Sequence, residues 1–467
     1  MMSSQFRICI RIRKILHGCV NANMAELATL ARGDPAGAAW HSSLQAFCGK
    51  YGGASSFDWD RSAKRAAVTN VWSQLQKQAE DSSDTLLSLT VVKIFMRDRM
   101  HIDVLLSLEA LELFVRLAEH AADEPAALEA IKCAINSVIA RPAFVAAVLA
   151  TPTYDHIFHL TTLARPFEFH TLVWKLLLAT FEHPAAIERV ERTLHGYACV
   201  LPTLAYCMQP TELFLKDVDR IALATELLKV LYVFASTWQN ATHLPPDIDS
   251  TADSCVLVYV LALLGNAALT CMNSAMALLS STLALPNTQS VLDFKLQAAN
   301  VLLIVQYPAL VDRFVAHDGV KHAVAFVEYA IMKVRVEKTQ EPSIVTPLVI
   351  GLHQLAKNNA HGFETLKRAI FAGRAPGDST SLAVANAPPL THAKPNLPLS
   401  QLPMSPPSLV KGSLHESMCA FMTSTNTDLK RCVSEFLFTL CHNNALEFTH
   451  CTGLGNAVAL LRLKGIM

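Results

Sequence analysis

The chain has 467 residues, of which 52% are hydrophobic and only 17% are charged, a composition that excludes disorder over most of its length. Lysine plus arginine and aspartate plus glutamate both total 39, so no basic excess exists to neutralise a nucleic-acid backbone. The 12 cysteines form no CxxC pair, which argues against a disulfide framework and a zinc ribbon and favours reduced thiols in a cytoplasmic protein.

Basic residues dominate the N-terminal segment. Four of them lie between Arg7 and Lys14, and no acidic residue precedes Glu26. The pattern fits an organelle-targeting segment or a reading frame opened upstream of a true start at Met24, and we favour the second because no serine-rich stretch follows. We therefore interpret residues 1–39 as an N-terminal extension, disordered or wrongly assigned, and expect the helical repeats to occupy residues 40–372.

Helical periodicity continues through most of the next segment. Between about residues 84 and 370, apolar residues recur at helical spacing, with short breaks at proline, glycine or asparagine. One predicted helix ends before Arg141-Pro142, and its apolar stripe consists of Leu128, Ile131, Ile135 and Val138. More than a dozen such segments without strand-like alternation predict an all-α fold, either a globular bundle or stacked repeats of the armadillo or HEAT type.

A long uncharged stretch lies inside this region. No charged residue occurs from Cys255 to Leu285, which is longer than the ~20 residues that span a bilayer. Polar pairs such as Gly265-Asn266 and Ser280-Ser281 interrupt it. We therefore expect two buried helices joined by a turn, rather than a membrane span.

The composition changes near residue 373. Residues 373–413 hold eight of the 22 prolines and predict a disordered loop before a C-terminal helical block at 414–467. In that block we expect a helix that begins at Thr427 as N-cap and ends before Asn443-Asn444. Its inward side chains are Leu429, Val433, Phe436, Leu437 and Leu440. We assign the aromatic side chains of Phe436, Phe438 and Trp174 to the core.

Motifs that carry chemistry are absent from the sequence. There is no phosphate-binding loop, no GxGxxG after a strand, no HExxH and no GxSxG. His156 and His159 lie three residues apart, but a metal site would need further ligands from distant helices, so we expect satisfied or solvent-facing histidines. The sequence predicts no catalytic residue, cofactor, metal ion or small-molecule substrate.

The C-terminal block resembles the closing block of the synembryn family. The segment SEFLFTLCHNNALEFTHCTGLGNAVALL, from Ser434 to Leu461, has the family's EFLF-x-LC helix followed by its TG-x-GNA-x-x-LL turn and helix. The preceding FMTSTNTDLKRC is similar to the family's LMTH-x-DTD-x-KR stretch. Weaker similarities run in family order through VVKIFMRDR, EAIKCAINSVI, FEFHTLVWKLLLAT, ALATELLKVLYVF, LLGN and ETLKRAIF. The resemblance covers about residues 40–467, with the proline-rich loop as an insertion.

This resemblance implies an armadillo-like superhelix that binds G-protein α subunits, GDP-bound or nucleotide-free. It implies a folding chaperone and a receptor-independent guanine nucleotide exchange factor that performs no covalent chemistry. A concave groove would hold the C-terminal helix of the α subunit and release GDP. We expect a cytoplasmic protein that reaches the plasma-membrane periphery only through its partner. The alternative is a generic armadillo or HEAT scaffold for another helix or peptide.

Four residues match the family's partner-binding positions. Lys93 and Arg97 lie four residues apart on one helical face, with Lys93 where arginine is usual. Asn136 aligns with a groove asparagine, and Lys367 matches a lysine near the C-terminal end of the partner. On spacing alone, an ordinary solvated face is the favoured interpretation of Lys93 and Arg97. For Asn136 an exposed asparagine is equally well supported, and for Lys367 the alternative is a charge at a helix end.

Two departures from the family bear on activity. Leu454 replaces the usual tyrosine, and Tyr259 stands near a position where histidine is common. Family members usually continue beyond the position of Met467 into an acidic, phosphorylatable tail that supports exchange. This sequence stops at Met467, so either the lineage lacks the tail or the sequence is truncated, and we expect chaperone-like binding to survive with weak exchange.

Overall fold

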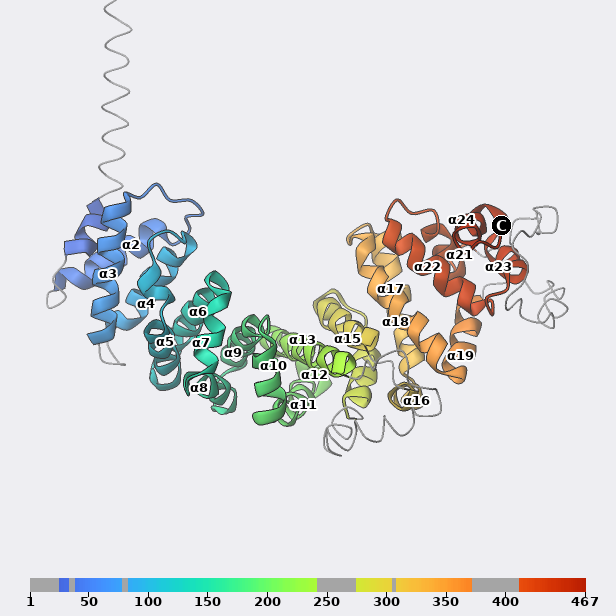
Figure 1. The fold of residues 1–467 in the computed structure, drawn as a ribbon, viewed down its shortest axis with the longest axis horizontal. Coiled ribbons are helices and arrows are strands. Elements are labelled where there is room, and N and C mark those ends of the chain that lie inside the picture. The colour runs from blue at the N-terminus through green and yellow to red at the C-terminus, as the bar shows by residue number, and fades with distance from the viewer. Residues whose placement is uncertain (1–24, 33–37, 78–82, 242–273, 305–307, 372–410) are drawn as a thin grey trace, which may run out of the picture. The chain divides into compact units, whose positions relative to one another are not determined.

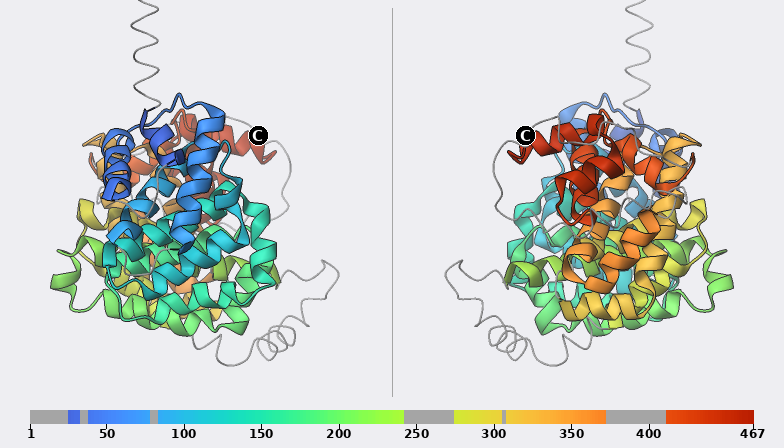
Figure 2. Two further views of the ribbon diagram at one scale, coloured as in Figure 1. Left: turned by 90° about the vertical axis from the view of Figure 1, so that its left-hand side faces the viewer. Right: turned by 90° about the vertical axis from the view of Figure 1, so that its right-hand side faces the viewer.

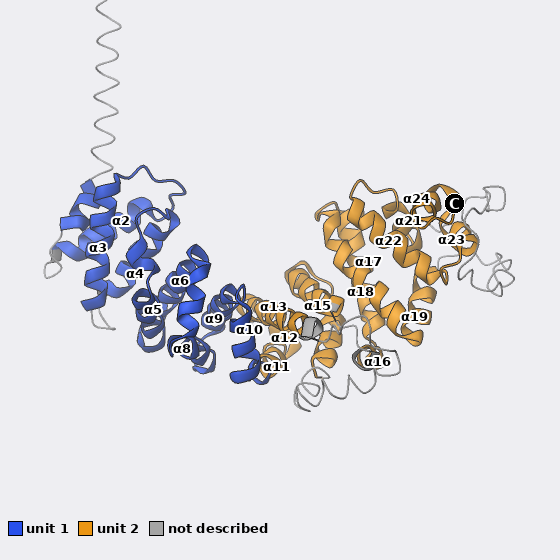
Figure 3. Cartoon of the chain, viewed as in Figure 1, with its two compact units in different colours: residues 1–199 blue, residues 200–467 orange. Residues whose placement is uncertain are grey.

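All regular structure in the described part of the chain is helical (Figures 1 and 2). The computed structural model describes residues 25–32, 38–77, 83–241, 274–304, 308–371 and 411–467. The helices form two compact units, residues 1–199 and 200–467, which we call unit 1 and unit 2 (Figure 3). The predicted all-α class with stacked helical repeats is confirmed. The interpretations of residues 1–23, of 255–273 and of most of the proline-rich segment fall outside the described residues.

Unit 1 consists of two layers of helices. In the first layer each helix contacts the next, from α2 (Ala38–Tyr51) through α4 (Ser83–Arg97) and α6 (Glu124–Ala140) to α9 (Phe167–Thr180). Against these pack α3 (Arg61–Lys77), α5 (Leu108–His120) and α8 (Thr153–His159). Such contact between alternate helices is typical of helical-repeat proteins. The short elements are η1 (Asp103–Leu106), η2 (Pro142–Phe144), α7 (Val145–Leu149), η3 (Leu160–Thr162), α10 (Pro184–Glu188) and the π-helical η4 (Arg189–Thr193).

Unit 2 repeats this arrangement. Its first layer runs through α13 (Val218–Ala241), α15 (Leu292–Ile304), α18 (Val345–Asn358), α22 (Thr427–Leu440) and α24 (Leu454–Leu463). The other elements are α12 (Thr211–Phe214), η5 (Gln289–Val291), α16 (Pro308–Ala316), α17 (Gly319–Arg335), η6 (Pro342–Ile344), α19 (Ala360–Phe371), α21 (Leu414–Phe421) and α23 (Ala445–Thr452). Helix α11 (Gly196–Cys207) contains the boundary between the units.

The buried face of α6 differs from the predicted stripe. Ile131 and Val138 are buried as expected, but Leu128 and Ile135 are only half-buried. The deepest positions also include small residues, namely Ala126, Ala127, Ala130, Cys133, Ala134 and Ser137. Because α6 contacts α4, α5 and α9, close packing on several sides selects small side chains that a single-stripe pattern misses.

The helix predicted before Asn443-Asn444 is confirmed as α22, but its N-cap residue differs from the prediction. The predicted inward side chains of α22 are all fully buried, and so are the aromatic rings that we assigned to the core. The N-cap is Asn426 rather than Thr427, because the Asn426 side chain accepts a hydrogen bond from the backbone N–H of Leu429 at 3.0 Å. Asn444 caps α23 in the same way, with bonds from the N–H groups of Leu446 and Glu447.

Lysine and arginine side chains from neighbouring segments bind the backbone carbonyls at several helix ends. Such a contact, which we call a carbonyl clasp, satisfies acceptors that have no partner inside the helix. Nζ of the buried Lys64 donates to the carbonyls of Asp98 and Met100, both at 2.6 Å. The other clasps are made by Arg97 to Gly52 and Ala54, by Arg165 to Glu119 and Ala121, and by Lys295 to Leu283 and Leu285.

Residues before the predicted start at residue 40 also contribute to the core. Residues 25–32 are helical, and Leu27 and Leu30 are completely buried. Lys50 of α2 pairs with Glu26 at 2.7 Å. The predicted domain boundary at residue 40 stays a prediction. The described residues 25–32, which precede it, already form a helix with buried side chains.

The uncharged stretch is described only from Ser274 onward. Ser274–Ala284 is a helix whose Ala275, Met276, Leu279 and Leu283 are buried, as expected for the second of the two helices. No single described helix has the length and apolar character to cross a bilayer; the pair Glu124–Ala140 and Pro142–Leu149, bent by 102°, meets the criterion by length and composition only.

Candidate functional site

Three of the predicted partner-binding residues, Lys93, Arg97 and Asn136, lie on the contacting helices α4 and α6. Lys93 on α4 forms an ion pair with Glu129 on α6, and Lys132 pairs with the other carboxylate oxygen of Glu129 at 3.1 Å. Asn136 follows one helical turn after Lys132. We call Lys93, Glu129, Lys132 and Asn136 the α4–α6 polar stripe. With two lysines and one glutamate, the stripe carries one net positive charge.

The stripe is held in place but remains accessible. The side chains of Lys93 and Lys132 are 23% and 33% exposed, while that of Glu129 is 12% exposed. The largely buried carboxylate of Glu129 therefore holds both lysine side chains in place. Asn136 is half-buried and has no hydrogen-bond partner for its amide among the described residues. Its donors and acceptor are available to a bound molecule.

Arg97 has a defined role within the fold. It lies one turn after Lys93 and is exposed, and its Nη1 donates to the carbonyls of Gly52 at 2.7 Å and Ala54 at 3.1 Å. One guanidinium nitrogen thus closes the turn after α2. The predicted contact of Arg97 with a partner stays a prediction beside this structural role.

Lys367 lies in unit 2, on α19. Its Nζ pairs with Oε1 of Glu447 on α23 at 2.9 Å, and both side chains are largely covered. The structure therefore groups Lys93, Arg97 and Asn136 on α4 and α6 within unit 1. Lys367 belongs to a separate pair that ties α19 to the C-terminal block.

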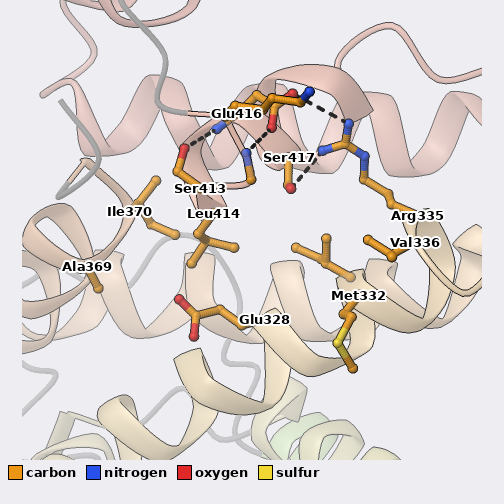
Figure 4. A pocket seen from close by; sticks show the side chains of 13 residues that line it. Glu328, Met332, Arg335, Val336, Ala369, Ile370, Ser413, Leu414, Glu416 and Ser417 are labelled. Atoms are coloured by element: carbon orange, nitrogen blue, oxygen red, sulfur yellow. Dashed lines mark hydrogen bonds and ion pairs between the residues drawn. The ribbon is translucent and has the colours of Figure 1, made fainter. Parts of the chain in front are cut away.

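Unit 2 contains a cavity that the sequence analysis did not predict. It has a volume of about 810 Å³ and lies among α17, α19 and α21 (Figure 4). Met332 and Val336 are exposed at its wall, and Arg335 reaches across to donate to the Ser417 hydroxyl at 2.7 Å. Leu414 and other apolar side chains complete the lining. Its walls come from α17, α19 and α21, which are separated in sequence, so no local pattern could have indicated it.

The chemistry available in these sites is that of binding. The thiols next to the stripe belong to Cys48 and Cys133, and burial raises the pKa of both, that of Cys48 to about 11. A thiol with a raised pKa stays protonated and is a poor nucleophile. The α4–α6 polar stripe offers ammonium groups and an amide, which suit a carboxylate or the exposed carbonyls of a docked helix.

Comparison with known proteins gives consistent matches. A family model described as "Guanine nucleotide exchange factor synembryn" matches residues 88–372 and 409–467. Among curated proteins, "Chaperone Ric-8A" of Xenopus laevis is 41% identical over 58 residues, which are 12% of this chain and 11% of the relative. The Gallus gallus protein of the same name is 43% identical over 58 residues, with the same coverage. The matched segment thus spans about a tenth of these relatives.

Among solved structures, two engineered proteins are similar. One has a TM-score of 0.49 and 14% identity and covers 94% of this chain and 90% of its own. The other has a TM-score of 0.35 and 13% identity and covers 68% of this chain and 97% of its own.

Proposed function

The chain belongs to the synembryn family of guanine nucleotide exchange factors, and from this premise we propose that it binds G-protein α subunits in their GDP-bound and nucleotide-free states. In this proposal it acts as a folding chaperone and as a receptor-independent exchange factor. The carrying observation is the family match, which includes all of α5 to α19 and α21 to α24. The relatives named as chaperones support the same role.

The mechanism that we propose is physical rather than covalent. The protein grips the C-terminal helix of the α subunit in a groove, as helical-repeat proteins commonly bind helices. A partner shifts an equilibrium only by its differential affinity for the two states. Exchange therefore requires tighter binding of the open, nucleotide-free α subunit than of the closed, GDP-bound one. GDP then leaves, and the complex protects the open state until GTP binds.

Within this mechanism, Lys93, Arg97, Asn136 and Lys367 contact the partner. Lys93 and Lys132 already share Glu129. A carboxylate from the partner can therefore join the α4–α6 polar stripe without either lysine first losing a counter-ion. Asn136 supplies amide hydrogen bonds to the docked helix. Lys367, paired with Glu447, plays the corresponding role in unit 2.

We also propose that the protein is cytoplasmic and reaches the plasma-membrane periphery through its partner. The eight cysteines in the described residues are all free thiols, which agrees with a reducing compartment. No small-molecule substrate or nucleic acid enters the proposal.

The test measures GDP release from a purified α subunit with and without this protein, together with gel filtration of the mixture. The matched control is the same α subunit without its C-terminal helix. We expect faster release and a stable nucleotide-free complex with the intact subunit only. A complex without faster release would restrict the function to that of a chaperone. If no α-subunit class bound, the proposal would be wrong, and a helical-repeat scaffold for another peptide would remain.

A further inference from the structure

The cavity in unit 2 lies where the described chain is interrupted and resumes. The description ends at Phe371, the last residue of α19, and begins again at Lys411. Residues 369–370 before this interval and residues 411–414 after it all line the cavity (Figure 4). The intervening segment is therefore attached to the cavity wall at both of its ends.

The part of the wall that α17 contributes presents apolar side chains to water. Met332 and Val336 are 39% and 76% exposed, and no large apolar side chain among the described residues is more exposed than Val336. The volume of about 810 Å³ lies within the range of ~300 to 1,000 Å³ that is usual for ligand sites. An exposed apolar wall beside such a cavity indicates a binding site for an apolar ligand or peptide.

The charges of the wall balance one another. Glu328 and Glu416 are matched by Arg335 and Lys411, so the lining has no net charge. Arg335 lies 3.9 Å from the Glu416 carboxylate and donates to the Ser417 hydroxyl at 2.7 Å, which compensates its charge within the wall. Because charge complementarity selects partners, a wall without net charge favours a neutral, apolar occupant over a strongly charged one.

The chain begins again at the cavity in a defined direction. The Ser413 hydroxyl accepts a hydrogen bond from the backbone N–H of Glu416 at 3.1 Å and caps α21. The Glu416 carboxylate accepts one from the backbone N–H of Gly412 at 2.8 Å. Both bonds fix the residues that follow Lys411, so the residues that precede it start from a fixed point on the wall.

We propose that residues 397–410 of the same chain, LPLSQLPMSPPSLV, occupy this cavity. The segment has no charged residue, six of its 14 residues are leucine, methionine or valine, and four are proline. It therefore matches the neutral, apolar wall. Proline lacks an N–H group and has a fixed φ, so such a segment buries few unpaired donors and loses little conformational entropy on binding.

The tether makes this occupant favourable even if its intrinsic affinity is low. Met404 lies seven residues before Lys411, and an extended chain of that length spans about 20 Å, so the central apolar residues can reach into the cavity. A tethered segment has an effective concentration that is on the order of millimolar. In the occupied state it covers Met332 and Val336, and any other peptide that binds there must first displace it. This proposal does not depend on binding of an α subunit.

The experiment is photocrosslinking within the purified full chain. A benzophenone amino acid replaces Val336, and the crosslinked peptides are identified by mass spectrometry. The matched control places the same amino acid at Val218, which is also a valine in unit 2 and is also 76% exposed. We expect crosslinks to residues 397–410 from position 336 and none to them from position 218. Equal results from the two positions, or no crosslink from position 336 to this segment, would overturn the proposal.

A mixture of chains with natural and heavy nitrogen distinguishes the possible occupants. Crosslinks within one chain have a single isotope composition, and these are the expected result. Crosslinks of mixed composition would identify a second copy as the occupant and overturn the proposal. So would an added α subunit that crosslinks to position 336 while residues 397–410 never do.

Variants of the segment provide a second readout, and their folding is compared by circular dichroism. Leu402→Asp/Met404→Asp should lower the crosslink yield about tenfold, because carboxylates replace side chains that are buried in the complex. Ser400→Asp/Ser408→Asp adds the same charge at polar positions and should lower it less. A fluorescent peptide of residues 397–410 should bind the first variant, whose cavity is open, and not the wild type. Equal yields in both variants, or equal peptide binding to variant and wild type, would contradict the proposal.

Discussion

Reversal of the ion pair between Lys93 and Glu129 separates a binding role of Lys93 from a structural one. The single variant Lys93→Glu places two carboxylates next to each other, whereas the swap Lys93→Glu/Glu129→Lys restores an internal pair with opposite polarity. The pair is partly exposed, at 23% and 12% for the two side chains. Its loss should therefore lower the free energy of unfolding by about 1 kcal/mol, near the upper limit for surface pairs. The swap should recover only part of this loss, because it also removes the carboxylate that pairs with Lys132.

Affinity for the α subunit should behave differently. If Lys93 bonds to a charged or carbonyl group of the partner, its removal costs about 2 kcal/mol, as for hydrogen bonds that involve a charge. That loss corresponds to about a thirtyfold weaker complex, since 1.36 kcal/mol is a factor of ten. We expect this loss in both the single variant and the swap, because neither has a positive charge on α4 at this position.

Urea unfolding measures the stability, and calorimetry with a GDP-bound α subunit measures the affinity. The matched control is the swap Lys50→Glu/Glu26→Lys, whose pair joins at 2.7 Å with 29% and 27% exposure and lies outside the family match. It should leave affinity unchanged. If the Lys93/Glu129 swap restored affinity together with stability, Lys93 would act only within the fold, and our assignment would be refuted.

Three further predictions concern stability. Burial lowers the pKa of Lys295 to about 8, below its unfolded value near 10.5, so the unfolded chain binds more protons between these pH values and the free energy of unfolding should rise with pH across that window. The variant Lys295→Met should be destabilised by about 2 kcal/mol, because the backbone carbonyls that Lys295 binds lose their donor. Its urea midpoint should not rise over the same pH window. Burial also lowers the pKa of His353, which bonds to Thr439 at 2.8 Å, to about 4. Its contribution is complete above about pH 6.5 and is lost as the pH falls toward 4, so unfolding curves at pH 7 and 5 should differ less in His353→Gln than in the wild type. Removal of the α23 N-cap by Asn444→Ala should lower the free energy of unfolding, measured by chemical denaturation, by about 1 kcal/mol. Asn444→Asp keeps an acceptor and should lose less. An unchanged unfolding midpoint in Asn444→Ala, or an equal loss in both variants, would contradict the capping role.

Local sequence patterns predicted the helices well because burial in a two-layer repeat leaves a clear periodic signal. The inward side chains of α22 illustrate this, since each was correctly assigned from spacing alone. Where a helix packs on several sides the signal fails, as in α6, whose buried alanines carry little hydrophobic contrast. The cap at Asn426 was misplaced by one residue because both Asn426 and Thr427 have side chains suited to capping.

The candidate sites were less predictable because they depend on contacts between remote residues. Lys93, Arg97, Asn136 and Lys367 were assigned from the family resemblance, and charge spacing alone did not distinguish them from solvated side chains. Their internal partners were not foreseen, because Glu129 and Glu447 reach them only through tertiary packing.

The carbonyl clasps affect how the chain folds during synthesis and which truncated fragments are stable. Arg97 and Arg165 are 45 and 46 residues downstream of Gly52 and Glu119, whose carbonyls they bind. During synthesis, the ends of α2 and α5 therefore remain incomplete until the next repeat has left the ribosome. The same dependence applies to truncated proteins made for experiments. A fragment that stops between a helix and its clasping cation should fray at that end, so stable fragments should end after Arg97 or Arg165 rather than before them.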